Sequence, residues 1–381
     1  MAADALQEHL LPLFQWFHRH PELGNQEHET TARIKEILAA EGVEVTDSGL
    51  PTGLVAVIKG REGGPVVALR SDIDALPITE ASGLPYSSEN EGRMHACGHD
   101  FHLTAMLGAA ILLKKAEKTL PGTVKLIFQP AEECGPGSKQ VVKTGILDDV
   151  QEIYGLHVDS EIEPGLISVG AGPITAAVGG FRIIVKGKGG HAASPQECID
   201  PIVAAAQIVN AAQTIVSRNL APEEKAVVSI THLAAGNTWN VIPGEALMEG
   251  TIRTLGTEKF KAVAEKLGQI AQGIGAATGT TIEYFWELGA PSVNNDPALT
   301  DFVRETAQSL GFPVKPCPAG MGGEDFSIYQ ERIPGVFWFI GVGSPQAGHH
   351  PGFAADTTCL HRASELLAAL GKGALDRLNK A

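Results

Sequence analysis

The sequence has no apolar run that approaches the roughly 20 residues a helix needs to cross a bilayer. Its first residues, MAADALQEHLLPLF, also lack the basic start and the small-residue cleavage site of a signal peptide. Neither a membrane span nor secretion is therefore indicated. We expect a cytoplasmic protein without a membrane partner.

Positive charge is scarce as well, since 29 Lys and Arg stand against 44 Asp and Glu, a formal net charge of −15. The basic residues do not gather into a stripe that could follow a phosphate backbone. We therefore expect no nucleic-acid partner.

Cysteines are few, odd in number and scattered: Cys97, Cys134, Cys198, Cys317 and Cys359. This pattern fits reduced thiols in a reducing compartment better than it fits a disulfide framework. A cysteine with a special role must then have that role through its own chemistry.

The 381 residues, 44% of them hydrophobic, suffice for two globular domains. Helical periodicity and apolar strand-like runs alternate early in the chain, which favours an α/β layered domain. The expected helices lie at 28–41 and 102–116, and the expected strands at 53–60, 65–74, 123–130 and 152–158.

From about residue 179 the order becomes strand, helix, two strands, helix, strand, which predicts a ferredoxin-like α+β module. The α/β style resumes after about residue 291, with a helix at 298–310, a strand at 336–343 and a closing helix from about 357. We therefore expect one α/β domain, residues 1–178 and 291–381, interrupted by a smaller domain, residues 179–290.

Chemically capable side chains follow four of the expected strands of the α/β domain. Ligands of open α/β sheets sit beyond the carboxyl ends of the strands, so these residues are candidates for one site. They are Asp72 and Asp74, Glu132 and Glu133, His157 and Asp159, and His349 and His350, to which the loop HACGHDFH adds Cys97, His99 and Asp100.

Carboxylate, imidazole and thiolate together suit a borderline divalent ion such as zinc, manganese, cobalt or nickel. Of the adjacent pair Glu132 and Glu133, one can bind metal while the other approaches a water molecule. A divalent ion lowers the pKa of bound water toward ~7, and a nearby carboxylate can move its proton to a leaving amine. The pattern thus favours metal-assisted hydrolysis.

The same residues allow alternative interpretations. Taken singly, Asp72 and Asp74 could be turn or cap residues, His157 a core histidine, and the remaining histidines and glutamates solvated. A thiol hydrolase could use Cys97 as nucleophile and His99 as base. A binding protein could also keep the ligands without turnover, although it would have no need for Glu132.

Nine motifs share their order and spacing with a known group of enzymes: RHPELGNQEHET, RSDIDALPI, HACGHDFHLT, IFQPAEE, GLHV, GKGGHAASP, NVIPGEALMEGTIRT, GGEDF and GHHPGF. From about residue 18 to 370 the chain resembles the aminoacylase and hippurate hydrolase amidohydrolases. This group includes plant auxin-conjugate hydrolases and belongs to the dinuclear metal-dependent aminoacylase/carboxypeptidase metallopeptidases.

The resemblance implies two divalent ions per subunit, a bridging role for Cys97, and Glu132 as general acid/base. Asp72 and Asp100 would orient ligands. In GHHPGF the resemblance assigns the ligand to the first histidine. The implied metal ligands are Cys97, His99, Glu133, His157 and His349.

The inserted domain would then be a dimerisation or lid domain, in a homodimer or higher homo-oligomer. Its His191 would stabilise an oxyanion in its own or the partner subunit. Asn240 and Arg253 would contact the substrate, Arg253 through a carboxylate, although a structural ion pair explains Arg253 equally well.

The implied reaction is cleavage of the amide bond of small N-acyl-L-amino acids such as hippurate, N-acetyl amino acids or related conjugates. The alternative with the same mechanism is a dipeptidase or small-peptide carboxypeptidase. A free α-amino group needs an anionic partner, whereas an acyl chain needs an apolar slot.

Overall fold

The computed structural model describes residues 3–135 and 137–380, and the chain divides into two compact units. The first takes in Met1–Gly172, Asn294–Pro318 and Asp325–Ala381, and the second Pro173–Val293 and Ala319–Glu324. The expected insertion, 179–290, lies inside the second unit. Residues 173–178, 291–293 and 319–324 were expected in the first domain but belong to the second unit. Backbone hydrogen bonds join residues 319–324 to that unit, such as Ala176 N–H to the Gly322 carbonyl at 2.9 Å.

The first unit is built on an eight-stranded sheet in the order β1-β2-β4-β3-β5-β16-β6-β15. Its strands are β1 Glu44–Thr46, β2 Leu54–Lys59, β3 Val66–Asp72, β4 Thr123–Gln129, β5 Glu152–Asp159, β6 Ile167–Val169, β15 Val314–Pro316 and β16 Gly335–Gly341. β3 runs parallel to β4 and β5, and β16 runs parallel to β5. These four strands therefore present their carboxyl ends at the same edge.

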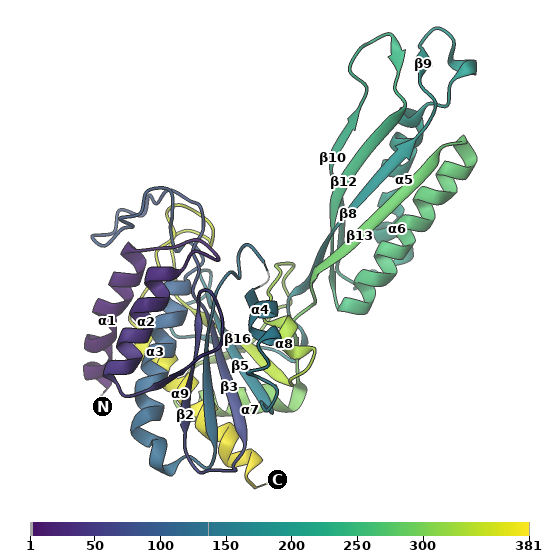
Figure 1. The fold of residues 1–381 in the computed structure, drawn as a ribbon. Coiled ribbons are helices and arrows are strands. Elements are labelled where there is room, and N and C mark those ends of the chain that lie inside the picture. The colour runs from purple at the N-terminus through teal and green to yellow at the C-terminus, as the bar shows by residue number, and fades with distance from the viewer. Residues whose placement is uncertain (1–2, 136, 381) are drawn as a thin grey trace. The chain divides into compact units, whose positions relative to one another are not determined.

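Helices cover this sheet on both faces (Figure 1). α3 and α9 pack against each other and against β3, with α1 against both, while α4 and α8 lie on the opposite face. The bounds are α1 Ala3–Arg19, α2 His28–Ala40, α3 His99–Ala116, α4 Gly137–Lys143, α7 Pro297–Ser309, α8 Ser327–Gln330 and α9 Leu360–Leu378, with the 3₁₀ turn η1 at Glu117–Thr119.

Helices α1 and α4 were not expected from the sequence, and α3 differs from the expectation at its start. α1 was not predicted, because Pro12 lies inside it and proline normally interrupts a helix. Its buried residues Leu6, Leu10 and Phe14 recur at helical spacing and anchor it to the core in spite of the proline. α3 begins at His99, earlier than the predicted residue 102.

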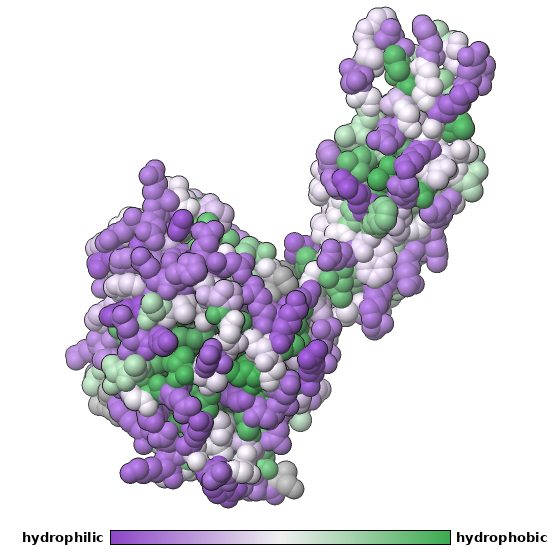
Figure 2. All heavy atoms as spheres, viewed as in Figure 1, coloured by the Kyte–Doolittle hydropathy of each residue, from purple (hydrophilic) through white to green (hydrophobic). Residues whose placement is uncertain are grey.

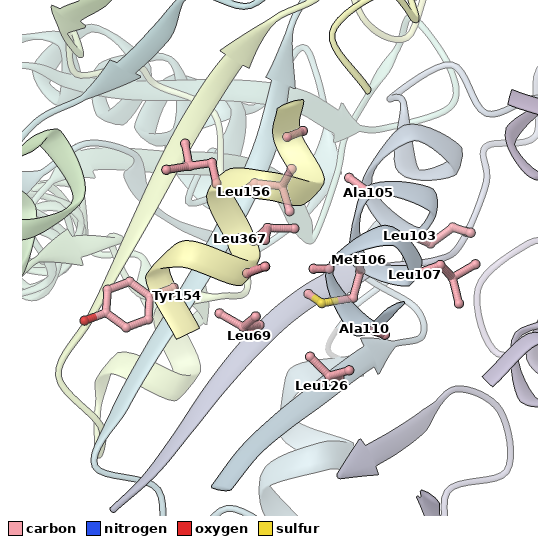
Figure 3. Close-up of a cluster of buried hydrophobic side chains, with 14 of the residues drawn as sticks. Leu69, Leu103, Ala105, Met106, Leu107, Ala110, Leu126, Tyr154, Leu156 and Leu367 are labelled. Carbon is pink, nitrogen blue, oxygen red and sulfur yellow. The ribbon is translucent and has the colours of Figure 1, made fainter. Parts of the chain in front are cut away.

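The core of the first unit lies between its sheet and the layer formed by α3 and α9 (Figure 3). Leu69 of β3 and Leu126 of β4 face Met106 of α3 and Leu367 of α9 there, and all four are fully buried. The central strands β3 and β4 are buried along most of their length because both of their faces are covered.

We expect Leu69→Ala to lower the free energy of unfolding by about 2–5 kcal/mol, because it leaves a cavity that the rigid sheet cannot close. Denaturant unfolding followed by circular dichroism measures this change. Leu310→Ala is the matched control, since Leu310 is 39% exposed and its truncation should change stability by about 0.5 kcal/mol or less. Equal effects of the two substitutions would contradict the assignment of Leu69 to the core.

The second unit is a four-stranded antiparallel sheet in the order β10-β12-β8-β13, with α5 and α6 packed against it. Strand, helix, two strands, helix and strand in this order form the predicted ferredoxin-like module. Its elements are β8 Ala176–Lys186, β9 Gly190–His191, η2 Pro195–Glu197, α5 Pro201–Asn219, β10 Ala226–Ala235, β11 Val241–Ile242, β12 Glu245–Leu255, α6 Thr257–Thr278 and β13 Thr281–Ala290. The two-residue strands β7 Gly172–Pro173 and β14 Asn294–Asn295 lie where the chain passes between the units.

The expected fold class, an α/β domain with an inserted smaller α+β domain, is confirmed. Among the helices of residues 3–135 and 137–380, none combines the length and the apolar character that spanning a membrane requires.

Candidate metal centre

Potential metal ligands gather at the carboxyl edge of the parallel strands of the first unit. Their donor atoms lie within 4.8 Å of one another in overlapping groups of three. The relevant groups are Cys97, His99 and His157; Cys97, Glu133 and His349; and His99, Glu132 and Glu133. The structure thus brings all five expected ligands and the expected base into one cluster.

The loop that carries Cys97 turns sharply into α3. Gly98 has φ 81°, a left-handed conformation that side chains rarely tolerate, and a Cβ there would lie 2.5 Å from Val158 Cγ2. This turn lets α3 begin at His99 and places Cys97 beside β5. Cys97 Sγ lies 3.3 Å from His157 Nε2.

The tautomer of His157 follows from its backbone contact. Its Nδ1 lies 2.6 Å from the Val158 carbonyl, which can only accept, so Nδ1 carries the proton and Nε2 keeps a free lone pair. Burial, reinforced by neighbouring His102, lowers the pKa of His157 to about 3. A neutral imidazole with a free Nε2 directed at Cys97 is the form that binds metal.

His99 is fully buried and faces two carboxylates on its Nδ1 side. Asp74 Oδ1 lies 3.3 Å from His99 Nδ1, and Asp72 Oδ1 lies 3.7 Å from it. Burial lowers the pKa of His99, but Asp72 and Asp74 outweigh it and raise the pKa well above its usual range. The other ring nitrogen, His99 Nε2, faces Glu133, and it lies 3.8 Å from Glu133 Oε1.

The pair Glu132 and Glu133 follows β4 in a short turn. Ala131 has φ 52°, and its carbonyl accepts a hydrogen bond from Gly137 N–H at 3.1 Å. Glu133 N–H donates to Asp74 Oδ2 at 3.0 Å. Asp74 therefore connects the turn of Glu133 to the buried ring of His99.

His349 reaches the cluster from the loop after β16. Its N–H donates to the Ala96 carbonyl at 2.8 Å, and its Nε2 lies 3.3 Å from Glu133 Oε1. Burial raises the pKa of Glu133, but the contact with His349 and the nearby His99 outweigh it and lower that pKa. The neighbouring His350 instead accepts a hydrogen bond from Gly352 N–H through Nδ1.

These residues fit a divalent cation. His99 Nε2 and Glu133 Oε1 are buried and form no hydrogen bond within residues 3–135 and 137–380. A buried imidazole nitrogen and a buried carboxylate oxygen that form no hydrogen bond cost free energy unless something else binds them. Thiol, imidazole and carboxylate donors converge on the same space, and this donor set suits zinc, manganese, cobalt or nickel.

The surroundings of Cys97 bear on the thiol-hydrolase alternative. Loss of solvation raises the pKa of the Cys97 thiol well above its usual range, although His99 opposes the shift. A nucleophilic cysteine needs the opposite shift. A metal ion, in contrast, can displace the thiol proton when it binds.

Asp72, which was expected to orient ligands, forms its hydrogen bonds with Arg70 and His102. Its Oδ2 accepts from Arg70 Nη1 at 2.7 Å and its Oδ1 from His102 Nδ1 at 2.6 Å. His102 Nε2 accepts the Val158 N–H at 2.8 Å, so His102 is neutral and links β3 to β5. The carboxylate closest to His99 is Asp74, which was expected at the strand end but had no assigned role.

Sequence reasoning also missed the buried group around Arg70. The Arg70 guanidinium donates to Asp72, to Gln129 Oε1 at 2.9 Å and to Asp325 Oδ1 at 2.9 Å. Asp325 comes from the GGEDF motif. The acidic pair after two glycines in this motif was the sequence feature that could have indicated a buried polar group. That Arg70 is its partner becomes evident only from the folded structure.

Asp100, expected to orient ligands, points away from the cluster toward α1. Its Oδ2 lies 2.6 Å from His18 Nδ1, and Glu80 Oε1 lies 3.2 Å from His18 Nε2. Burial lowers the pKa of His18, but these two carboxylates outweigh it and raise the pKa to about 9. His18 therefore ties α1 to the start of α3.

This contact predicts a pH dependence of stability. A folded-state pKa of about 9 against an ordinary 6.5 means that the stabilisation is complete below pH 6.5 and is lost as the pH rises through 9. We expect the free energy of unfolding to fall by about 3 kcal/mol more in the wild type than in His18→Gln over that interval. Denaturant titrations at several pH values measure the difference, and parallel pH curves would refute it.

The other expected residues belong to the second unit. His191 in β9 pairs with Val241 of β11, and the Asn240 carbonyl accepts the Ala192 N–H at 3.1 Å, so His191 and Asn240 lie close together. Arg253 in β12 donates to the Met321 carbonyl at 2.9 Å. Within the described residues Arg253 has no ion pair, so the structural ion pair considered from the sequence is not observed.

Comparison with known proteins supports the resemblance. N-acetylcysteine deacetylase of Bacillus subtilis (strain 168) is 46% identical over 371 residues, covering 97% of this chain and 98% of that protein. IAA-amino acid hydrolase ILR1-like 4 of Arabidopsis thaliana is 39% identical over 365 residues, covering 93% of this chain and 82% of that protein. The crystal structure of the Bacillus subtilis YXEP protein, described as a dinuclear metal-binding peptidase from the M20 family, matches with a TM-score of 0.90 and 43% identity, over 98% of this chain and 99% of that one.

The model of peptidase family M20/M25/M40 matches residues 68–372. This range includes every residue of the cluster described above. The expected enzyme class, a metal-dependent hydrolase of amide bonds, is confirmed. The chain belongs to peptidase family M20/M25/M40.

Proposed function

We propose that this protein is an amidohydrolase that splits N-acyl-L-amino acids into a carboxylate and an amino acid. One observation carries the proposal. A carboxylate oxygen of Glu132 lies within 4.8 Å of candidate ligand atoms of His99 and Glu133, and a carboxylate at that place suits a general acid/base. The names of the relatives, a deacetylase of N-acetylcysteine and a hydrolase of IAA-amino acids, support small acylated amino acids as the substrate class.

We assign the metal ligands to Cys97, His99, Glu133, His157 and His349. The name of the similar YXEP structure supports two ions, and Cys97, common to two of the three-residue groups, is suited to bridge them. When bound, the metal supplies Lewis acidity that activates water and polarises the amide carbonyl. Asp74 holds the His99 ring and the Glu133 backbone in place for this purpose.

The protein residues supply the proton transfer. The Glu132 carboxylate accepts a proton from the attacking water and returns it to the leaving amine nitrogen, so that the amine departs neutral. We assign oxyanion stabilisation to His191, and contacts with the carboxylate of the substrate to Asn240 and Arg253. Asp72 acts at a distance, by holding Arg70 and His102.

A substrate panel tests the proposal. Purified protein loaded with zinc, manganese, cobalt or nickel is given N-acetyl, N-benzoyl and indole-acetyl amino acids, with free dipeptides as the comparison. We expect turnover of at least one acylated series to exceed that of the dipeptide with the same side chain. Preference for the dipeptides would instead establish the peptidase alternative. A site that prefers a free α-amino group must offer that group an anionic partner, which an acylated amino acid does not need.

We also propose that the second unit is a dimerisation or lid domain, in a cytoplasmic homodimer or higher homo-oligomer. Hydrophobic residues gather over its strands (Figure 2), and Leu233, Trp239 and Phe285 are 47%, 93% and 58% exposed. Apolar side chains this exposed are typical of an interface. Sedimentation velocity should show at least a dimer, and a monomer at micromolar concentration would exclude this part of the proposal.

A further inference from the structure

The motif RHPELGNQEHET has no part in the metal centre as assigned so far, yet it packs directly against it. Between α1 and α2, Leu23 pairs with Ala75, and the Glu22 carbonyl accepts the Ala75 N–H at 2.8 Å. Ala75 directly follows Asp74, the carboxylate beside His99. The segment therefore lies along the strand end that holds the ligands.

The same segment contacts the turn that carries the glutamate pair. A Cβ at Gly24 would lie 2.4 Å from Cys134 Sγ and 3.1 Å from the Ala131 Cα. Asn25 Nδ2 also lies 3.7 Å from Cys134 Sγ. Only a glycine allows so close an approach. The segment between α1 and α2 therefore packs against the residues on either side of Glu132 and Glu133.

Glu27 makes the decisive contact. Its side chain is fully buried, and its Oε1 accepts the Ala131 N–H at 2.8 Å while its Oε2 accepts the Thr52 hydroxyl at 2.8 Å. Within the described residues it has no cationic partner. Burying a carboxylate costs free energy, which its hydrogen bonds offset. Packing alone therefore does not explain why a glutamate occupies this position.

The conformation of Ala131 supplies that reason. Its φ of 52° is one that residues other than glycine rarely adopt, and such strain persists only where surrounding contacts impose it. The bond from Glu27 fixes its N–H, and Gly137 N–H fixes its carbonyl. The direction of the chain at Ala131 determines where Glu132 and Glu133 point.

We propose that Glu27 is a positioning residue for the reaction. It locks the turn at Ala131 and thereby sets the base Glu132 and the ligand Glu133 relative to His99. The expected effect of Glu27 on catalysis rests on the proposed function. Its expected effect on the conformation of the turn does not.

Glu22 offers a matched control in the same segment. It is 8% exposed, and its carboxylate accepts the N–H groups of Glu29 and Thr30 at 3.2 and 2.8 Å, in the first turn of α2. Glu22→Ala should therefore weaken α2 as the loss of a helix cap does, without reaching the turn at Ala131. Glu27→Ala removes a carboxylate from the turn itself.

The experiment compares Glu27→Ala, Glu27→Gln and Glu22→Ala in cobalt-loaded protein. We expect Glu27→Ala to lower kcat by about 10- to 100-fold with little change in KM, because a small misplacement of catalytic groups is costly. It should also alter the visible absorption spectrum of bound cobalt and speed hydrogen exchange at residues 131–135. Glu22→Ala should change none of these, and Glu27→Gln should keep most of kcat because its amide oxygen still accepts the Ala131 N–H.

A kcat, cobalt spectrum and exchange rate in Glu27→Ala equal to those of Glu22→Ala would overturn the proposal. If the wild type hydrolyses no acylated amino acid, the proposed function fails. Hydrogen exchange at residues 131–135 still tests whether Glu27 holds the turn at Ala131. Should Glu27→Ala not fold, Glu27→Asp serves in its place, since it keeps the charge but falls one methylene short of Ala131.

Discussion

Glu132→Gln should lose about 10²–10⁴-fold in kcat while it binds metal as the wild type does. The substitution keeps the size and polarity of the side chain but removes its ability to accept a proton from water. The expected ligands Cys97, His99, Glu133, His157 and His349 are untouched. Steady-state kinetics on the best substrate of the panel, with metal content measured on the same sample, give both quantities.

The adjacent residue provides the control for this prediction. Glu133→Gln replaces an expected ligand whose Oε1 lies 3.3 Å from His349 Nε2, and it should lose metal as well as activity. The two variants therefore separate base from ligand at neighbouring positions. If Glu132→Gln loses metal while Glu133→Gln keeps it, the two roles are exchanged; if Glu132→Gln keeps full activity, the base lies elsewhere.

Removal of metal by a chelator should lower turnover by at least about 10³-fold. Several kcal/mol of stabilisation of the transition state depend on the ion, and each 1.4 kcal/mol corresponds to about a factor of ten in rate. Dialysis against chelator followed by addition of zinc, manganese, cobalt or nickel measures the loss and its recovery. Unfolding of the same samples should show added stability of about 4 kcal/mol at a free metal concentration of about 1,000 times Kd.

Thiol alkylation tests the thiol-hydrolase alternative on the same samples. The high pKa of the Cys97 thiol predicts slow alkylation of this residue in protein stripped of metal and protection once metal is bound. Activity that survives stripping but is abolished by alkylation would show that Cys97 is a nucleophile. Stoichiometric metal binding with no turnover of any substrate would point to a binding protein.

The sequence already located most of the candidate centre. Carboxyl ends of parallel strands meet at one edge of a sheet, so Glu132, Glu133 and His157 could be expected together from the strand pattern alone. The same reasoning could not decide between Asp72 and Asp74. Asp72 ends β3 and Asp74 lies two residues beyond it, and the partners of both residues come from elsewhere in the chain.

What the sequence by itself determined was therefore the fold class, the order of the elements and the kinds of donor atoms that meet at the strand ends, because these depend on local periodicity. The tertiary structure alone decided which buried polar groups pair. Arg70 forms a hydrogen bond with Asp325, and Glu27 with Ala131, although the partners are far apart in the sequence. A buried hydrogen bond leaves no periodic trace in the sequence, since its two partners need to be close only after the chain has folded.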